Sequence, residues 1–465
     1  MRFIDREHEL RHLESEYRSG SPKFVVLYGR RRVGKTRLIE EFIKGKEALY
    51  YTAAQETEKQ QVAEFKNIIA SKLSDTFLQS ADISTWTQMF AYLKKAWPSD
   101  KKIVLAIDEV TYIIKSNPSF PSYLQKLWDE HLSKTKTFLI LSGSLIGLML
   151  KEVLSGPSPL YGRRTSQMLL APLGFSDASK FFKSFSFEER ISYYSIIGGI
   201  PKYLELVNPG EPVEDFIKEK FLNKDGFFYQ EALFLISQEF QEPSTYMDIL
   251  KAISFGNTKL NEISNYTGME AKIISRYLDI LLAIGLIKKE TPVTEDEKKS
   301  RKSIYTLKDN FLAFWYRFVQ PNTSYIEIRR PSKAREQVSR DLNSFVGKAF
   351  EGVCKEAMTL IMRDATKMGK WWSKKGDEID IVALDEKNRE ITFAECKWQD
   401  NANPNAILIG LKDKASLVEW NKGKRKESYV IFAKSFQNKK EENAGLYDLT
   451  RIEQLFKRMN NRPKK

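Results

Sequence analysis

Two acidic residues and a lysine interrupt a pair of otherwise apolar stretches in the last third of the chain. The segment EIDIVALDEKNREITFAECKWQ contains Asp380, Glu395 and Lys397. Carboxylate oxygens are the ligands that Mg²⁺ prefers, and a nearby lysine can stabilise the charge that develops on a phosphate under attack. These residue types therefore point to metal-assisted hydrolysis of a phosphodiester.

Strand pairing is what must bring these residues together. A hairpin that turns near Lys387 and Asn388 places Asp380 directly opposite Glu395, with Cβ atoms about 4.5–5.5 Å apart. The same register places Glu378 opposite Lys397 on that face. The other face is predicted to be largely apolar, with Ile379, Ile381, Ala383, Ala394, Cys396 and Trp398.

The charged residues of the hairpin also fit a reading without catalysis. Facing carboxylates repel one another, so a hard cation between Asp380 and Glu395 is expected, and these two residues are the predicted Mg²⁺ ligands. The alternative is an exposed ion pair between Glu378 and Lys397, which contributes under about 1 kcal/mol, with Asp380 and Glu395 solvated at the rim of the sheet.

A second set of residues has the spacing of a phosphate-binding loop. The segment GRRRVGKT follows the apolar run FVVLY and precedes the helical pattern TRLIEEFI. In such a loop, backbone N–H groups surround the phosphates, Lys35 reaches the β and γ oxygens, and the Thr36 hydroxyl binds Mg²⁺. The predicted nucleotide contacts are Gly29, Arg30, Arg31, Arg32, Val33, Gly34, Lys35, Thr36 and Arg37.

An acidic strand end completes this predicted nucleotide site. The segment IVLAIDEV ends in Asp108 and Glu109. Asp108 is expected to hold the Mg²⁺ ion together with Thr36, and Glu109 is expected to orient the attacking water as a base. ATP or GTP with Mg²⁺ is the predicted ligand.

The order of apolar patterns predicts an α/β multidomain chain. Residues 23–150 alternate short apolar strands with helical patterns, which indicates a parallel sheet with crossover helices. Helical periodicity follows, and a polar stretch bounded by prolines marks a linker. The predicted domains are a P-loop core over 1–170, a helical lid over 171–240, a winged helix over 241–320, a linker over 321–340 and a second α/β domain over 341–465.

The winged-helix prediction rests on three short helical patterns, 245–253, 260–266 and 271–284, followed by a hairpin around a basic loop. In the third pattern Ile273, Ile274, Tyr277, Leu278 and Leu281 are expected to form the buried face. Such modules place their third helix in the major groove of DNA, although many bind only proteins. The predicted DNA contacts are Lys272, Arg276, Lys298, Lys299, Arg301 and Lys302.

The amino-terminal motifs resemble those of prokaryotic, chiefly archaeal, P-loop ATPases of the AAA+/STAND group. Beside GRRRVGKT, the resemblance includes FIDREHEL, IDEV, LSGS, SPLYGRRT and GGIPKYLEL, within residues 1–240. It implies ATP hydrolysis coupled to a conformational change, with Ser144 as a sensor of the γ-phosphate and Arg163 or Arg164 as an arginine finger. Ser144 as a strand-capping turn residue, and the two arginines as an exposed basic loop, remain open alternatives.

The pattern D-x(14)-E-x-K resembles the PD-(D/E)xK nuclease superfamily, in its Holliday-junction-resolvase-like and restriction-endonuclease-like branches. The resemblance covers roughly residues 341–450 and lacks the Pro-Asp dipeptide. It implies a restriction-endonuclease-like domain in which Glu351, on the preceding helix, is a further acid. Mg²⁺, or Mn²⁺ in its place, is the implied metal at Asp380 and Glu395.

Charge and composition narrow the partners. The formal charge is +14, with 75 Lys and Arg against 61 Asp and Glu, which favours DNA as a partner, although a lysine-rich solvated surface gives the same balance. The amino terminus has no apolar signal segment, and the apolar run at 138–150 is short for a bilayer span. A cytoplasmic protein with no membrane contact is expected, with ATP-dependent homo-oligomerisation as an implication of the ATPase resemblance.

Three functions follow from these features. The first is a DNA-binding ATPase with a Mg²⁺-dependent nuclease domain. The second is a STAND-type regulatory ATPase whose nuclease-like domain only binds DNA or protein. The third is an ATP-dependent protein scaffold.

Overall fold

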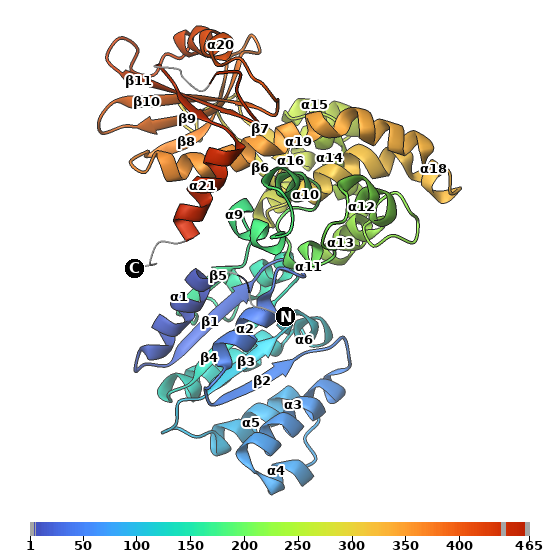
Figure 1. Ribbon diagram of the computed structural model, residues 1–465. Coiled ribbons are helices and arrows are strands. Elements are labelled where there is room, and N and C mark those ends of the chain that lie inside the picture. Colours follow the sequence, from blue (N-terminus) through green and yellow to red (C-terminus); the bar gives the residue numbers. More distant parts are fainter. Residues whose placement is uncertain (1–3, 5, 439–442, 461–465) are drawn as a thin grey trace. The chain divides into compact units, whose positions relative to one another are not determined.

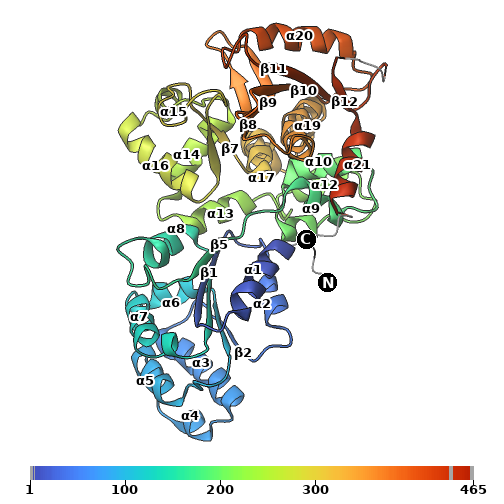
Figure 2. The same ribbon diagram turned by 90° about the vertical axis from the view of Figure 1, so that its left-hand side faces the viewer.

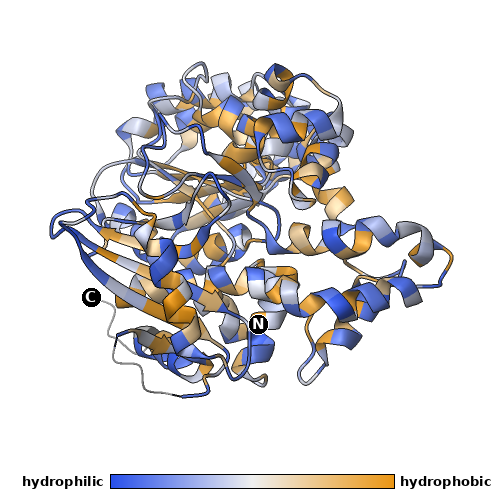
Figure 3. Cartoon of the chain, turned by 90° about the horizontal axis from the view of Figure 1, so that it is seen from above, coloured by the Kyte–Doolittle hydropathy of each residue, from blue (hydrophilic) through white to orange (hydrophobic). Residues whose placement is uncertain are grey.

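A computed structural model describes Ile4, residues 6–438 and residues 443–460. The chain divides into two compact units, Met1–Pro172 and Leu173–Lys465. Each unit contains a five-stranded sheet, and unit 2 also contains a two-stranded one (Figure 1). Hydrophobic and hydrophilic residues alternate along the helices of the chain, as expected of helices that cover a core with one face (Figure 3).

The sheet of unit 1 is parallel throughout, as the sequence predicted. Its strands are β1 (Lys23–Tyr28), β2 (Ala48–Thr52), β3 (Val104–Asp108), β4 (Phe138–Gly143) and β5 (Ser166–Leu169). They lie in the order β2-β3-β4-β1-β5. The short edge strand β5, whose side chains are not fully buried, has no counterpart among the predicted strands.

Helices cover both faces of this sheet, which explains why β3 and β4 are buried along their whole length. The helices of unit 1 are α1 (Glu7–Arg18), α2 (Lys35–Ile43), α3 (Glu58–Leu73), α4 (Thr76–Ser80), α5 (Trp86–Ala96), α6 (Val110–Ser116), α7 (Phe120–Glu130) and α8 (Ile146–Met149). α1 and α2 pack on one face, and α3, α5, α6 and α7 pack on the other (Figure 2).

Unit 2 begins with helices and continues into a winged helix. The first helices are α9 (Phe175–Ala178), α10 (Phe187–Ile197), α11 (Pro201–Leu204), α12 (Val213–Lys220) and α13 (Glu231–Glu239). The winged helix consists of α14 (Pro243–Ser254), α15 (Leu260–Thr267), α16 (Ala271–Ala283) and the antiparallel pair β6 (Ile287–Glu290) and β7 (Ile304–Leu307). Its helices and hairpin lie where the sequence pattern predicts them.

The buried face of α16 is narrower than predicted. Ile274, Leu278 and Leu281 are fully buried, but Ile273 is 44% exposed, so its assignment to the core was wrong. The three buried positions already form the i, i+4, i+7 stripe that contacts the rest of the module, and Ile273 lies beside that stripe.

The stretch 321–340 is helical, so its description as a linker was wrong. It contains α18 (Thr323–Glu327) and the start of α19 (Ser332–Ile361), after α17 (Asn310–Phe314). Ile326, Ala334 and Val338 are buried, and this apolar contact holds the segment against its neighbours. Pro331 immediately precedes α19, where proline ends one segment and permits the next helix to start.

A mixed sheet forms the rest of unit 2. Its strands are β8 (Lys367–Trp372), β9 (Glu378–Asp385), β10 (Glu390–Lys397), β11 (Lys426–Ala433) and β12 (Gly445–Tyr447), in the order β12-β11-β10-β9-β8. α19 and α21 (Leu449–Asn460) pack on one face, and α20 (Pro404–Ser416) packs on the other (Figure 2).

The predicted hairpin register is confirmed from Asp385 opposite Glu390 to Ile381 opposite Ala394. Beyond Ile381 the strand is irregular, because Gly369 pairs with Val382 whereas Trp371 pairs with Ile379, which leaves one extra residue in β9.

This irregularity corrects the predicted faces. Ile379 was assigned to the face of Ile381, but it packs with Val382 in the core under α20. A single inserted residue reverses the alternation of side chains. Ile379, which precedes Asp380, therefore lies on the opposite face from the predicted one.

Candidate functional sites

The phosphate-binding loop packs tightly against the end of unit 1. A Cβ atom on Gly29 would lie 2.4 Å from the Leu170 carbonyl oxygen, so only glycine fits there. Lys35 is 5% exposed, and its Nζ donates hydrogen bonds to the carbonyl oxygens of Gly29 at 2.9 Å and Arg30 at 3.1 Å. The loop and its lysine therefore have the compact arrangement that phosphate binding requires.

Thr36 and Asp108, the predicted ligands of the nucleotide-bound Mg²⁺, lie side by side. Asp108 is wholly buried, and its Oδ2 accepts hydrogen bonds from Thr36 Oγ1 at 2.7 Å and from the Tyr50 hydroxyl at 3.0 Å. Its Oδ1 accepts from the Glu109 N–H at 2.9 Å. A hydroxyl and a carboxylate at the carboxyl end of a parallel strand form the oxygen set that Mg²⁺ takes beside a phosphate.

Glu109 faces the phosphate-binding lysine. Its Oε1 lies 4.0 Å from Lys35 Nζ. Its Oε2 accepts hydrogen bonds from Ser144 Oγ at 2.6 Å and the Ser144 N–H at 3.2 Å. Ser144, expected to sense the γ-phosphate, thus orients the residue expected to act as the base. The left-handed backbone of Glu109, with φ 52°, is uncommon outside glycine and occurs at functional sites.

The loop arginines differ in their surroundings. Arg30 is buried, whereas Arg32 and Arg37 are exposed, and Arg37 pairs with Glu40 at 3.3 Å. Arg31 donates a hydrogen bond to the Tyr112 hydroxyl. Charge therefore surrounds the loop on several sides.

The two arginines expected as fingers contact groups outside the loop. Arg163 pairs with Asp129 of α7 at 3.1 Å. Arg164 donates to the Leu154 carbonyl oxygen at 3.2 Å and lies over the Tyr161 ring. Their role as fingers stays a prediction.

Arg6 contacts the phosphate-binding loop but was not among the predicted site residues. It is 7% exposed, and its Nη2 donates to the carbonyl oxygens of Val33 at 3.1 Å and Ala171 at 2.6 Å. Its Nη1 contacts Glu9 at 3.0 Å. The side chain thus ties the phosphate-binding loop to the last residues of unit 1. No local pattern reveals a contact between residues 165 positions apart.

At the hairpin, Glu395 is held by two lysines. Glu395 is 5% exposed, and its Oε1 accepts a hydrogen bond from Lys397 Nζ at 2.9 Å. Lys414 of α20 contacts the two carboxylate oxygens of Glu395 at 2.9 and 3.1 Å. Lys414 was not among the predicted residues, because its contact depends on how α20 crosses the sheet.

Asp380 lies in a strained electrostatic setting. Its Oδ2 accepts the Cys396 N–H at 2.8 Å. Burial, followed by the charges of Glu395 and Glu351, raises the pKa of Asp380 to about 7. The structure therefore brings Asp380, Glu395 and Glu351 within electrostatic reach of one another.

Glu351 and Glu378 share a different cation from the one expected. Lys370 Nζ contacts Glu351 at 2.6 Å and Glu378 at 2.7 Å. Glu378 was expected to face Lys397, but it pairs with Trp372 across β8 and with Lys370 instead. Burial lowers the pKa of Lys370, but the two carboxylates outweigh burial and the pKa is raised overall.

The predicted metal site at the hairpin has few protein donors. Within the described residues, no group of three or more His, Cys, Asp or Glu side chains is arranged to hold a metal ion. Mg²⁺ commonly takes only one or two carboxylates and completes its shell with water and phosphate oxygens. Asp380 and Glu395 as ligands of such an ion stay a prediction.

Five of the six predicted DNA contacts are exposed, as expected. Lys272 and Arg276 are exposed on α16, and Lys298, Lys299 and Arg301 are exposed after β6. Lys302 instead pairs with Glu295 inside the same loop.

Over the residues that the structure covers, no helix has the length and hydropathy needed to cross a bilayer.

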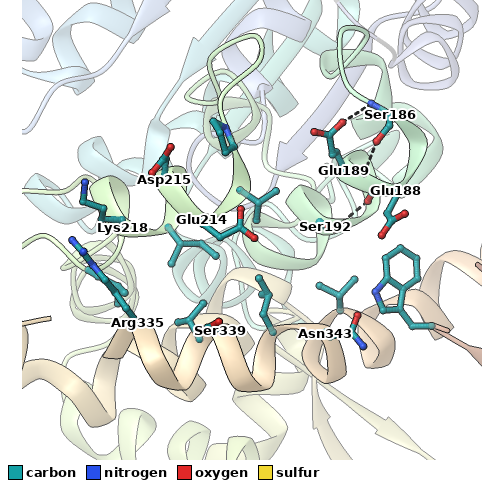
Figure 4. A pocket seen from close by; sticks show the side chains of 18 residues that line it. Ser186, Glu188, Glu189, Ser192, Glu214, Asp215, Lys218, Arg335, Ser339 and Asn343 are labelled. Atoms are coloured by element: carbon teal, nitrogen blue, oxygen red, sulfur yellow. Dashed lines mark hydrogen bonds between the residues drawn. The ribbon is translucent and has the colours of Figure 1, made fainter. Parts of the chain in front are cut away.

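A cavity of about 770 Å³ lies in unit 2 between α10, α12 and α19. Figure 4 shows Glu214, Asp215 and Lys218 of α12 on one side and Arg335 and Ser339 of α19 on the other. None of the predicted site residues lines it.

Three family models match the chain. Residues 3–207 match the ATPase domain predominantly from Archaea. Residues 244–289 match the bacterial regulatory protein, arsR family, a helix-turn-helix model. Residues 315–408 match a family described as archaeal and bacterial proteins of unknown function.

A relative and two solved structures are similar to this chain. An uncharacterized protein of Methanocaldococcus jannaschii is 37% identical over 455 residues, which cover 96% of this chain and 99% of that protein. The Walker-type ATPase of Pyrococcus abyssi is 20% identical with a TM-score of 0.49, over 68% of this chain and 96% of that one. Cdc6p from Pyrobaculum aerophilum is 12% identical with a TM-score of 0.34, over 70% and 95%. The chain belongs to the same family as the Methanocaldococcus jannaschii protein and carries an archaeal-type ATPase domain followed by an ArsR-type helix-turn-helix.

Proposed function

We propose that the chain is an ATP-hydrolysing, DNA-binding protein whose carboxyl-terminal sheet carries a Mg²⁺-dependent centre for phosphodiester cleavage. The proposed domains keep the boundaries expected from the sequence, except that the stretch 321–340 is helical and is not a linker. ATP-dependent self-association, with Arg163 or Arg164 acting on a neighbouring subunit, belongs to the same proposal.

The nucleotide site supports the first part. Lys35 is positioned to bind phosphate, and Thr36 is positioned to bind Mg²⁺ beside Asp108. Ser144 donates a hydrogen bond to Glu109, whose other carboxylate oxygen lies near Lys35. A carboxylate in that position orients a water for attack on the γ-phosphate.

A single contact carries the nuclease part: the Asp380 carboxylate accepts the N–H of Cys396, the residue after Glu395, at 2.8 Å, and the charges of Glu395 and Glu351 act on it there. A bound Mg²⁺ supplies positive charge and a more acidic water there. Asp380 and Glu395 hold it, and the Lys397 ammonium stabilises negative charge on the phosphate oxygens. Lys414 holds the Glu395 carboxylate in place.

Cleavage is tested with a panel of linear duplex, branched and single-stranded DNA incubated with Mg²⁺. The wild-type protein is expected to cut at least one substrate, and Asp380→Asn and Lys397→Met are expected to abolish cutting while ATP turnover continues. Asp385→Asn is the matched control, because Asp385 lies on the same strand but contacts Asn388 at the hairpin turn. Intact DNA throughout the panel, with ATP still hydrolysed, contradicts the nuclease part.

A regulatory ATPase is the second candidate, and the lysine pairing of Glu395 favours it. Two ammonium groups on one buried carboxylate already balance its charge without a metal. In that case the chain retains nucleotide tightly, turns it over slowly and binds DNA without cutting it. A protein scaffold instead predicts weak DNA binding whose affinity does not depend on salt concentration. A protein with six phosphate contacts loses affinity by a factor on the order of 10³ between 50 and 200 mM salt.

A further inference from the structure

The turn between α15 and α16 fixes how α16 is presented. Gly268 has a left-handed backbone, with φ 70°, and its N–H donates a hydrogen bond to the Ser264 carbonyl oxygen at 2.9 Å. The Ser264 hydroxyl in turn donates to the Met269 carbonyl oxygen at 2.6 Å. The three helices of the winged helix lie together (Figure 2). A second helix held in this way is the one that a helix-turn-helix places in the major groove of DNA.

The first half of α16 presents three side chains outside the buried stripe. Lys272, Ile273 and Arg276 are exposed, at the second, third and sixth positions of the helix. Tyr277 does not join them, because its hydroxyl donates to Glu242 at 3.3 Å and its ring packs on Tyr246. The amino-terminal residues of a recognition helix are the ones that reach base edges.

The charge on this face is not balanced by carboxylates of the chain. Within the described residues, neither Lys272 nor Arg276 makes an ion pair. The same is true of the exposed side chains in the loop after β6, which are Lys298, Lys299 and Arg301. Unpaired cations on a helix and its adjoining loop complement a phosphate backbone.

Ile273 is an apolar side chain inside this basic surface. It is 44% exposed and lies between Lys272 and Arg276. The major groove offers one apolar group to such a side chain, the C5 methyl group of thymine, whereas arginine binds the O6 and N7 atoms of guanine. Ile273 and Arg276 are three positions apart, so their Cβ atoms are roughly 5–6 Å apart. Successive base pairs rise by about 3.4 Å, so the two side chains reach bases one or two pairs apart.

We propose that α16 reads sequence in the major groove through Ile273, which contacts the methyl group of a thymine, and Arg276, which binds a guanine one or two base pairs away. Lys272 contacts a neighbouring phosphate. This inference rests on the proposed DNA binding, and it gives that binding a sequence preference.

The test uses the full chain in EDTA and a pool of random-sequence duplex DNA, enriched for binding to the wild-type protein. The enriched pool is copied with thymine or with uracil, which lacks only the C5 methyl group and keeps charge and pairing. The wild-type protein is expected to bind the thymine copy about fourfold more tightly, the effect of burying one methyl group. Ile273→Ser is expected to bind the two copies equally in fluorescence anisotropy.

Ile280→Ser is the matched control. Ile280 is 41% exposed on the same helix, but it lies at the tenth position, beyond the residues that reach base edges. This variant is expected to keep the wild-type preference for thymine. A change in the shape of uracil DNA affects all of these proteins alike, so only a direct contact separates Ile273→Ser from Ile280→Ser.

Arg276→Ala provides an independent comparison. A copy of the pool with 7-deazaguanine lacks the N7 acceptor, and the wild-type protein is expected to bind it about fivefold less tightly or worse. Arg276→Ala is expected to lose this difference and to keep the preference for thymine. Ile273→Ser is expected to do the reverse.

Each outcome decides the inference. Equal binding of the thymine and uracil copies by the wild-type protein overturns it while DNA binding stands, and so does a pool that binds but does not enrich. Loss of the thymine preference in Ile280→Ser also overturns it. No binding of any duplex by the wild-type protein overturns both the inference and the proposed DNA binding. Loss of the thymine preference in Ile273→Ser alone supports it, whether or not the chain cuts DNA.

Discussion

The nucleotide site and the hairpin site hold their carboxylates by different means. At the nucleotide site, Asp108 accepts hydrogen bonds from Thr36, Tyr50 and the Glu109 N–H, and Glu109 accepts from Ser144. At the hairpin site, Asp380 accepts one backbone N–H, and burial together with neighbouring carboxylates raises its pKa. Neutral donors hold Asp108 at the first site, whereas at the second site lysines hold Glu395 and Glu351, and Asp380 has a single backbone donor.

This difference shows which site depends on an added cation. Hydrogen-bonded carboxylates keep their geometry without further charge, whereas clustered carboxylates in a partly buried place gain most from a divalent ion. Substitutions at the two sites are therefore expected to act in opposite directions on stability and separately on activity.

The largest effect is expected from Glu109→Gln, which separates ATP turnover from the hairpin site. Loss of a general base costs roughly 10²–10⁴-fold in turnover, while Lys35 and Thr36 still hold the nucleotide. Phosphate release and binding of a fluorescent ATP analogue measure the two effects. Asp385→Asn serves as the control, and turnover within threefold of wild type contradicts the role of Glu109.

A pair of isosteric changes tests the opposite signs directly. Because the folded-state pKa of Asp380 is raised from 3.8 to about 7, the folded state binds the proton more tightly than the unfolded chain. Stability contributed at this position is therefore greatest below about pH 4, falls as the pH rises to about 7, and stays low above it. Asp380→Asn is expected to raise the free energy of unfolding at pH 8, in EDTA, by on the order of 2 kcal/mol.

Asp108→Asn is expected to lower the free energy of unfolding at pH 8. Its amide can no longer accept at both oxygens, and a lost buried acceptor costs about 1–3 kcal/mol. Chemical denaturation of both variants at pH 5 and pH 8 checks the signs. If both variants shift the free energy of unfolding in the same direction at pH 8, the contrast between the sites fails.

Arg6→Ala is expected to weaken ATP binding by about tenfold, or about 1.4 kcal/mol, because the Val33 carbonyl oxygen loses its guanidinium donor. Arg6→Lys should recover part of the affinity, since an ammonium reaches one carbonyl oxygen but cannot bridge two. Calorimetric titration with ATP gives the comparison. Equal affinity in all three proteins removes Arg6 from the nucleotide site.

The smallest effect is expected from Tyr50→Phe. Asp108 keeps the Thr36 and Glu109 donors, so the free energy of unfolding should fall by only about 0.5–1.5 kcal/mol. ATP turnover should change by less than threefold. A collapse of turnover in this variant would mean that the network depends on Tyr50 more than its remaining donors suggest.

Local patterns predicted the parts of both sites that depend on neighbouring residues in sequence. The spacing around Lys35 predicted the loop, and the turn near Lys387 and Asn388 predicted the register that pairs Ile381 with Ala394. The irregularity beside Asp380 was not predictable, because it arises where β9 meets β8.

Long-range contacts account for what the sequence did not reveal. Lys414 reaches Glu395 only because α20 crosses the sheet, and Arg6 reaches Ala171 only through the packed fold of unit 1. The same holds for the loop after β6, in which Val293 docks on β8. Such contacts depend on tertiary packing that no local periodicity records.

The most direct test is a crystal soaked with Mn²⁺ and a slowly hydrolysed ATP analogue, examined for anomalous density at both sites. The site at Thr36 and Asp108 provides an internal control for metal entry. We expect a second peak between Asp380 and Glu395. A peak beside the nucleotide with none between Asp380 and Glu395 would contradict a metal-dependent centre at the hairpin.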